Sequence, residues 1–145
     1  MALTEKSVLV EYAAAQMYAL VADVPSYPEF LPWCGGAEVL REEDDVVHAA
    51  IRIDFRGIRQ QFSTENRLHA PDLIEMKLVD GPFRTLDGSW RFKALGDQAC
   101  RVDFRLHYEF SSRLLEKLVG PVFHYIANTF VDAFVKRAAQ LYGPR

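Results

Sequence analysis

Few residues of this 145-residue chain have the types and spacing that catalysis or metal binding requires. HxxxH and HExxH spacings are absent among the four histidines, His48, His69, His107 and His124, so no metal site is expected. The chain has no GxSxG motif, no glycine-rich phosphate loop and no evident Cys/His pair. Cys34 and Cys100 form no CxxC pair, which is typical of reduced cysteines in a cytosolic protein. We therefore expect a protein that is not an enzyme, with no catalytic residue, metal or cofactor.

Two segments point instead to apolar recognition. The stretch "YPEFLPWCGG" at 27–36 has the prolines and glycines of a loop, yet loops are usually polar and this one is apolar. Its apolar residues are Tyr27, Phe30, Leu31, Pro32 and Trp33. A second loop is expected at "VDGPFRTL" (79–86), with Phe83 and Leu86 as its apolar tip. Either the two loops roof and gate one end of a cavity, or both simply cap the core.

The strand predicted over "IRQQFSTENRL" has an unusual inward face. Three polar residues, Gln60, Thr64 and Asn66, share the parity of Ile58, Phe62 and Leu68. Buried polar groups need hydrogen-bond partners, and neutral donors in an apolar cavity suit the carbonyl groups of a ligand. The alternative is an edge strand, or a bulge that turns these groups outward.

The elements that position these residues follow from hydrophobic periodicity. A strand that presents Val8, Val10 and Tyr12 on one face is followed by a short helix, which Pro25 ends. Between Ala37 and Phe110 a period of two, interrupted by turn signals, predicts six antiparallel strands. Apolar pairs then recur every four residues from Arg113 to Tyr142, which predicts a long helix capped by one of the serines at 111–112. The pattern predicts an α+β fold, a single domain over 1–145, in which a bent antiparallel sheet wraps around a long C-terminal helix.

Composition and charge limit the possible partners. Half of the residues are hydrophobic and the formal net charge is −3, which argues against a dedicated nucleic-acid binder. No uninterrupted apolar run approaches the roughly 18 residues of a membrane span. Charges at Glu5, Lys6 and Glu11 interrupt any signal-peptide apolar region. We expect a cytoplasmic protein.

The outward face of the predicted sheet nevertheless has an excess of basic residues. Nine bases are expected there: Arg52, Arg56, Arg59, Arg67, Lys77, Arg91, Lys93, Arg101 and Arg105. Five acids accompany them: Asp54, Glu65, Glu75, Asp103 and Glu109. Such a face suits the phosphates of ribosomal RNA or an anionic membrane, with Arg52, Arg59, Arg91, Arg101 and Arg105 as the expected contacts. The alternative is a solvated face with cross-strand ion pairs.

Three motifs, "YPEFLPWCGG", "LVDGPFRTLDGSWRF" and "ANTFVDAFVKRA", resemble those of one family. This family is the START-like ubiquinone-binding proteins, also called RatA-type ribosome-association toxins and, in older usage, oligoketide cyclases. The resemblance covers nearly the whole chain and implies a helix-grip fold (START-like, Bet v 1-like, SRPBCC superfamily) that encloses an apolar cavity. One departure is the "VEYAA" segment, where Ala13 cannot cap the first helix as serine would, at a cost of about 1 kcal/mol.

The resemblance implies noncatalytic binding of ubiquinone or a similar polyprenyl lipid, in support of cellular respiration. If the protein contacts a membrane, the resemblance implies a peripheral contact with the inner membrane. We expect the cavity to be lined by large inward residues: Phe62, Met76, Trp90, Phe104, Phe123 and Phe130. An alternative function is binding of the large ribosomal subunit, as in a toxin–antitoxin system, which blocks subunit association. A polyketide cyclase or aromatase activity is a weaker alternative, because no positioned acid–base pair is evident.

Overall fold

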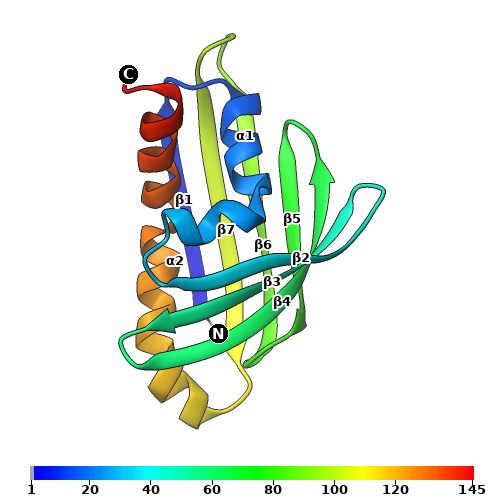
Figure 1. The fold of residues 1–145 in the computed structure, drawn as a ribbon, viewed down its shortest axis with the longest axis vertical. Helices are drawn as coiled ribbons and strands as arrows, with labels where there is room; N and C mark the ends of the chain where they lie inside the picture. The colour runs from blue at the N-terminus through cyan, green and yellow to red at the C-terminus, as the bar shows by residue number, and fades with distance from the viewer. Residues whose placement is uncertain (1) are drawn as a thin grey trace.

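A seven-stranded antiparallel sheet curves around one long helix in a computed structural model that describes residues 2–145 (Figure 1). The chain runs through β1 (Ala2–Val10), α1 (Ala14–Ala22), the 3₁₀ helix η1 (Val24–Glu29), β2 (Cys34–Glu43), β3 (Val46–Phe55), β4 (Ile58–His69), β5 (Leu73–Asp80), β6 (Phe83–Ala94), β7 (Cys100–Phe110) and α2 (Arg113–Tyr142). The predicted fold class, the six consecutive strands and the long helix are all confirmed.

The strands follow one another through the sheet in the order β1-β7-β6-β5-β4-β3-β2. The six strands β2 to β7 form a meander, and β1 adds to its far edge by pairing with β7, Val8 opposite Val102. The predicted first strand therefore starts earlier than its alternation indicated, at Ala2, and Tyr12 lies beyond its end although its side chain is buried. Along β7 inward and outward residues alternate as predicted, because one face of the strand packs on the core.

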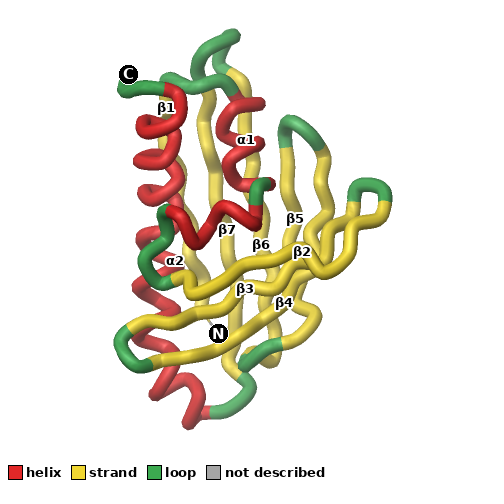
Figure 2. Tube along the Cα trace, viewed as in Figure 1, coloured by secondary structure: helices red, strands yellow, loops and turns green. Residues whose placement is uncertain are grey.

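The segment between α1 and β2 is more regular than the sequence indicated. Residues Val24–Glu29 form η1, so Tyr27 lies in a 3₁₀ helix and the loop proper is short (Figure 2). Ala13 at the start of α1 has no capping side chain, but its backbone N–H donates to Oε1 of Gln16 at 2.9 Å. One unpaired donor of the helix terminus is thus satisfied in spite of the missing serine.

The long helix α2 is capped by Ser112, whose Oγ accepts a hydrogen bond from the Leu115 N–H at 3.2 Å. Its far end is held by Tyr12, which donates to the Gly143 carbonyl at 2.8 Å. An 18-residue window of α2 has a mean hydropathy of 1.3, long and apolar enough for a membrane span by length and composition alone. Residues such as Val119, Phe123 and Val131 are buried between α2 and the rest of the fold, as expected for a core helix.

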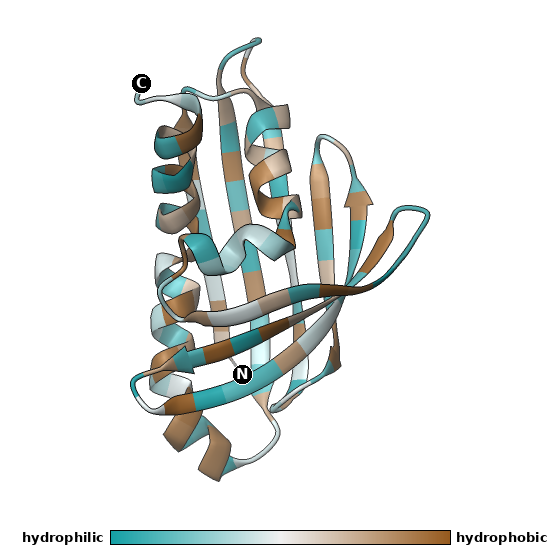
Figure 3. Ribbon diagram, viewed as in Figure 1, coloured by the Kyte–Doolittle hydropathy of each residue, from teal (hydrophilic) through white to brown (hydrophobic). Residues whose placement is uncertain are grey.

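The core lies between the concave face of the sheet and α2, and α1 packs over the upper part of the same face (Figure 1). Hydrophobic residues alternate with polar ones along the long strands, whereas α2 is strongly apolar where its chain begins (Figure 3). Gly88 of β6 has the inward parity of Leu86 and Trp90 and lies between β5 and β7, opposite Met76 and Leu106.

We predict that Gly88→Ala destabilises the fold by about 1–3 kcal/mol, through overpacking. A Cβ atom at this position would lie 2.6 Å from the carbonyl oxygen of Arg105, so the backbones of β6 and β7 would have to separate. Urea denaturation measures the change, with the neighbouring outward substitution Ser89→Ala as control. A Gly88→Ala protein as stable as the control would show that the strands do not need this close approach.

Candidate functional site

The interior contains two clusters of aromatic rings along α2. The first surrounds Phe130 and Phe134 and includes Trp90 and Phe104, whose ring centroids are 4.6 Å apart. Its remaining members come from η1 and the loop that follows: Tyr27, Phe30 and Trp33. The rings meet mostly edge to face or tilted, the arrangements that aromatic pairs prefer. This cluster joins the apolar segment at 27–33 to the middle of the sheet.

The second cluster surrounds Phe123, seven residues earlier on α2. Phe83 and Tyr108 each lie with ring centroids 4.8 Å from that of Phe123. Phe62 and Phe110 complete the group, and Phe62 lies 5.9 Å from Phe83. Seven residues of helix correspond to a rise of about 10 Å, so the two clusters are two turns apart along α2.

The two segments predicted to gate one end of a cavity therefore do not lie together in this structure. Trp33 packs in the first cluster and Phe83 in the second, and they come from separate parts of the interior. Phe83 and Leu86 are not loop tips, because both lie within β6 and only residues near Gly81 form the turn. The sequence located the apolar residues correctly but not their partners.

The apolar residues of the stretch at 27–33 pack mainly into the interior. Tyr27, Leu31 and Trp33 are buried, whereas Phe30 is half-buried and Pro32 is exposed. The Tyr27 hydroxyl donates to the Val21 carbonyl at 2.5 Å, and burial raises its pKa well above the ordinary value. The segment is a lid of the core, anchored to α1 by this hydrogen bond.

In this structure the predicted cavity is filled by side chains. Trp90, Phe104 and Phe123 are each about 1–2% exposed and contact neighbouring rings. Phe62, Met76 and Phe130 are half-buried and pack against the same core. Five hollows of residues 2–145 open at the surface, and Phe62, Trp90, Phe104, Phe123 and Phe130 line none of these five. A ligand between sheet and helix would have to displace these rings.

The polar residues of β4 face the interior, which is the first of the two alternatives that the sequence allowed. β4 lies between β3 and β5, so it is not an edge strand, and the bulge between Ser63 and Thr64 does not turn the polar groups outward. Thr64 and Asn66 are buried, and the Thr64 hydroxyl donates to the Asn66 amide oxygen at 2.8 Å. Gln60 is half-buried. This hydrogen bond does not use the Asn66 amide NH₂, which is therefore the donor that the pair can offer to another group.

Trp90 contributes a second buried polar group that periodicity did not indicate. Its side chain is 1% exposed, and its Nε1–H has no hydrogen-bond partner in residues 2–145. A buried donor without a partner costs about 1–3 kcal/mol. The rings of Phe92, Phe104, Phe130 and Phe134 pack around the Trp90 ring, and none of them carries an oxygen acceptor.

A hollow that the sequence analysis missed opens at the start of α2, with a volume of about 440 Å³. The Tyr108 hydroxyl and Nδ1 of His124 form a hydrogen bond on its wall. Burial raises the pKa of Tyr108, so the phenol keeps its proton. Arg84, Arg113 and Glu116 line the rest of the opening. The two partners are sixteen residues apart on different elements, and no spacing rule links them.

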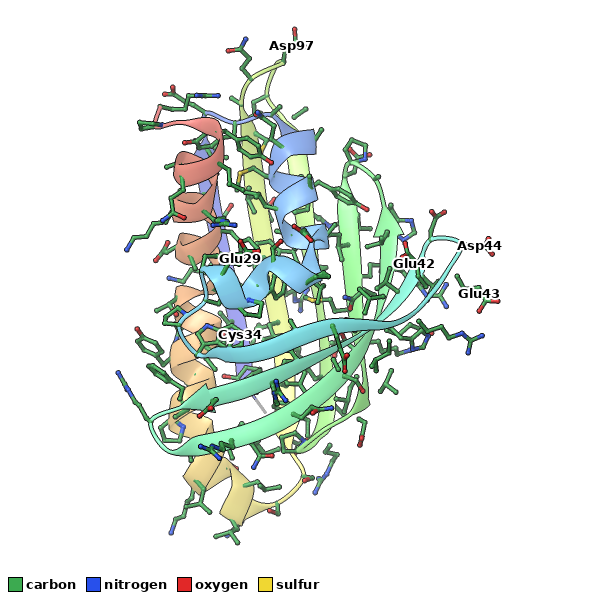
Figure 4. All side chains as sticks on the ribbon, in the orientation of Figure 1. Glu29, Cys34, Glu42, Glu43, Asp44 and Asp97 are labelled. Atoms are coloured by element: carbon green, nitrogen blue, oxygen red, sulfur yellow. The ribbon has the colours of Figure 1, made fainter. Side chains whose placement is uncertain are left out.

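A second hollow of about 320 Å³ lies between the 27–33 segment and the later turns of α2. Arg137 stacks over the Phe30 ring at 5.1 Å and binds Oε1 of Glu29 at 3.2 Å. This ion pair holds the outer side of the lid against α2, close to the labelled Glu29 and Cys34 in Figure 4. Burial raises the pKa of the Cys34 and Cys100 thiols, both of which are free cysteines.

The five arginines predicted on the sheet exterior are all exposed. Three have partners: Arg52 donates to the Gly35 carbonyl at 3.1 Å, Arg59 lies 3.6 Å from Asp54 on the neighbouring strand, and Arg101 lies 3.1 Å from Asp103. Within residues 2–145 no carboxylate lies within 4.0 Å of Arg91 or Arg105. Ion pairing therefore accounts for part of this face, and Arg91 and Arg105 remain available.

The predicted charge excess of the sheet exterior is too large. Arg56 stacks over the rings of Phe55 and Tyr125, at 4.8 and 4.9 Å, and so belongs to the α2 side. Two acids missing from the prediction, Glu5 and Asp87, face outward beside Arg105 and His107. Without Arg56 and with these two acids, eight bases stand against seven acids, so the predicted excess of four bases falls to one. Among the described residues, no group of three His, Cys, Asp or Glu side chains has the geometry of a metal site.

Comparisons with known proteins agree with this architecture. The sequence family described as polyketide cyclase / dehydrase and lipid transport matches residues 10–135. The ribosome association toxin RatA of Pseudomonas aeruginosa is 43% identical over 139 residues, covering 96% of both chains, and that of Escherichia coli K12 is 44% identical over 140 residues, covering 97% of this chain and 89% of its own. A mitochondrial coenzyme Q-binding protein COQ10 homolog B of Xenopus laevis is 30% identical over 142 residues, which span 95% of this chain and 58% of that protein.

Solved structures share the fold. The Zhui aromatase/cyclase from Streptomyces matches with a TM-score of 0.79 at 17% identity over 99% of both chains. A START superfamily protein from Mycobacterium smegmatis matches with a TM-score of 0.77 at 22% identity, over 96% of this chain and 98% of its own. These likenesses define a START-like helix-grip protein. The chain belongs to the polyketide cyclase / dehydrase and lipid transport family, among the relatives that carry the names RatA and COQ10 homolog.

We predict that Trp33→Ala and Phe83→Ala each lower the free energy of unfolding by about 3–5 kcal/mol, the usual cost of deleting a buried large ring. Trp33 is 3% exposed and Phe83 is 5% exposed, and each contacts several rings. Chemical denaturation measures both, with the exposed Pro32→Ala as control. A loss below about 1 kcal/mol would mark either residue as a mobile gate and not as core.

Proposed function

We propose that this protein binds a polyprenyl quinone such as ubiquinone, without catalysis, between the sheet and α2, and acts as its carrier or chaperone in respiration. The observation that carries the proposal is the unpaired Trp90 Nε1–H inside a shell of aromatic rings. A quinone offers an aromatic-sized ring for these side chains and a carbonyl oxygen for the indole N–H. Its prenyl tail would replace water on apolar surface, with a gain of about 25 cal/mol per Å².

The Thr64–Asn66 pair supports the same ligand class. Both groups are neutral, so they can face an uncharged quinone without the cost of burying an unpaired charge. The name of the Xenopus laevis relative and the lipid transport description of the family agree with lipid binding. The interior is closed here, so entry requires the lid at 27–33 and α2 to separate, a rearrangement found in a substantial minority of complexes.

We predict that Trp90→Phe weakens binding of a short-chain ubiquinone by about tenfold, the value of one buried hydrogen bond near the upper end of its range. The same variant should bind a hydrocarbon of equal tail length, without carbonyl groups, as well as the wild type does. Fluorescence titration or calorimetry gives both affinities. Trp33→Phe is the matched control. It also removes an indole N–H, but Trp33 lines the surface hollow beside α2 and is not the residue proposed to bind the quinone carbonyl.

Equal losses for the two ligands in Trp90→Phe would mean that the variant damages the interior and that the N–H makes no ligand contact. Organic extraction of the purified wild-type protein, followed by analysis of the extract for quinone, tests the ligand class directly. Absence of binding to any quinone by the folded wild-type protein would refute the proposed function.

A second function, association with the large ribosomal subunit, is favoured by the names of the relatives that are 43–44% identical. On this chain the exposed Arg91 and Arg105 of neighbouring strands are the groups best placed to meet phosphate. Their contacts would weaken as salt rises, because each neutralised phosphate releases a counterion. An aromatase or cyclase activity has less support, because the likeness to such an enzyme is at 17% identity and concerns the fold.

We predict that the double variant Arg91→Glu/Arg105→Glu loses co-sedimentation with large ribosomal subunits at low salt, whereas Arg41→Glu does not. Arg41 is equally exposed but lies on β2 and already pairs with Glu43 at 2.7 Å. Raising the salt should release the wild type. If wild-type protein does not sediment with subunits even at low salt, the ribosome function does not apply to this chain.

A further inference from the structure

The solvent-facing half of the first turns of α2 has an unusual composition. The exposed residues between 113 and 125 are Arg113, Leu114, Glu116, Lys117, Leu118, Pro121, His124 and Tyr125. On a helix of 3.6 residues per turn, the basic residues Arg113 and Lys117 fall on one edge, and Leu114, Leu118 and Tyr125 fall together beside them. We name this set, without Glu116, the α2 docking face. Glu116 lies about 60° around the helix from Arg113, on the side away from the leucines, so the face itself contains apolar and basic residues and the acid lies outside its Arg113 edge.

The apolar part of this face is large for an exposed surface. Leu114 is 65% exposed, Leu118 is 57% exposed and Tyr125 is 40% exposed. The buried side of the same turns, with Val119 and Phe123, already packs on the sheet. Leu114 and Leu118 therefore do not contribute to the core. Contiguous exposed apolar residues of this kind mark interaction surfaces.

Basic side chains flank the apolar stripe on both sides. Arg113 and Lys117 form one border, and Arg56 of the β3–β4 turn forms the other, with its guanidinium 4.9 Å from the centre of the Tyr125 ring. Arg84 lies nearby on the wall of the hollow at the start of α2. Two acids also line that hollow: Glu109, which is 3.6 Å from Arg84, and the exposed Glu116.

The acids of the chain gather elsewhere. Glu42, Glu43 and Asp44 project from the tip of the β2–β3 hairpin, at the right of Figure 4, far from the start of α2 at the bottom. On α2 itself the first exposed acid after Glu116 is Asp132, beyond the docking face. The molecule is thus polarised in spite of its net charge of −3.

We infer that the α2 docking face rests on an anionic lipid bilayer, with Leu114 and Leu118 in the headgroup–acyl boundary and Arg113, Lys117 and Arg56 at the lipid phosphates. Apolar residues between basic ones are the composition of helices that lie in a membrane interface. A contact with water-soluble protein would not require basic residues on both borders and no acid between them. The inference extends the proposed lipid binding, because it places the bilayer beside the helix that covers the quinone site.

Vesicle flotation tests this inference with the full chain and vesicles that contain no quinone. Wild-type protein should bind phosphatidylcholine vesicles that contain an anionic phospholipid, bind pure phosphatidylcholine vesicles more weakly, and dissociate as salt rises. Leu114→Ser/Leu118→Ser should reduce partitioning by about tenfold or more, since two leucines lose their apolar contact. Arg113→Glu/Lys117→Glu should reduce binding to anionic vesicles by at least about fivefold per residue.

Matched controls come from the other end of the same helix. Leu141 is 53% exposed and Lys136 is exposed, so Leu141→Ser and Lys136→Glu make the same chemical changes away from the docking face. Both controls should bind vesicles as the wild type does. All substituted side chains are exposed, so thermal midpoints should change little.

Three results would overturn the inference: no binding of wild type to anionic vesicles at low salt, equal losses in the Leu141→Ser control, or full binding by the leucine double variant. If the leucine variant instead abolishes self-association in sedimentation, the face is a contact between copies of the chain. If Arg113→Glu/Lys117→Glu loses only ribosome co-sedimentation, the face is a ribosome contact. A failed quinone titration leaves the vesicle result unaffected, so the two proposals are tested separately.

Discussion

The structure depends on the packing of α2 against the concave face of the sheet. Phe123 and Phe130 each bring together rings from strands far apart in the sequence, and Phe134 adds the 27–33 segment. An antiparallel sheet with one apolar face needs a cover, and a strongly bent one needs a narrow cover. The helix α2 is this cover. Its apolar residues are distributed over more than one stripe, and the curved surface of the sheet contacts them.

This packing determines how much free energy a ligand can gain by binding at the proposed site. The interior is dense, so a ligand replaces ring–ring contacts as well as water, and the net gain is smaller than its buried area indicates. The unpaired Trp90 Nε1–H counts in the opposite direction, because the closed state keeps an unsatisfied donor that a carbonyl oxygen would satisfy. The closed form is thus less stable than a fully apolar core of the same shape, a bias toward ligand binding.

The distribution of charge gives the molecule an orientation. The sheet exterior is nearly neutral once Glu5 and Asp87 are counted, the β2–β3 hairpin is acidic, and the first turns of α2 are basic and apolar. An acidic protein can therefore approach an anionic surface by one end without strong repulsion, since exposed charges more than about 10 Å apart are largely screened at physiological salt. The proposed quinone site and the proposed α2 docking face share the same helix, so a motion of α2 would affect both.

The sequence by itself determined the order of the long elements and the face of most residues on the strands. A period of two identified six strands and the inward parity of Thr64 and Asn66, and recurring apolar pairs identified α2 with a cap at Ser111 or Ser112, because backbone geometry repeats at fixed intervals. Only the tertiary structure decided which of these residues meet. Trp33 and Phe83 belong to different clusters, Arg56 turns toward Tyr125, and Tyr108 reaches His124. Such contacts depend on strand register, on bulges such as the one between Phe83 and Thr85, and on turn conformation, such as the positive φ of Arg56. Periodicity carries no information about these, because it describes one element at a time and a contact requires two.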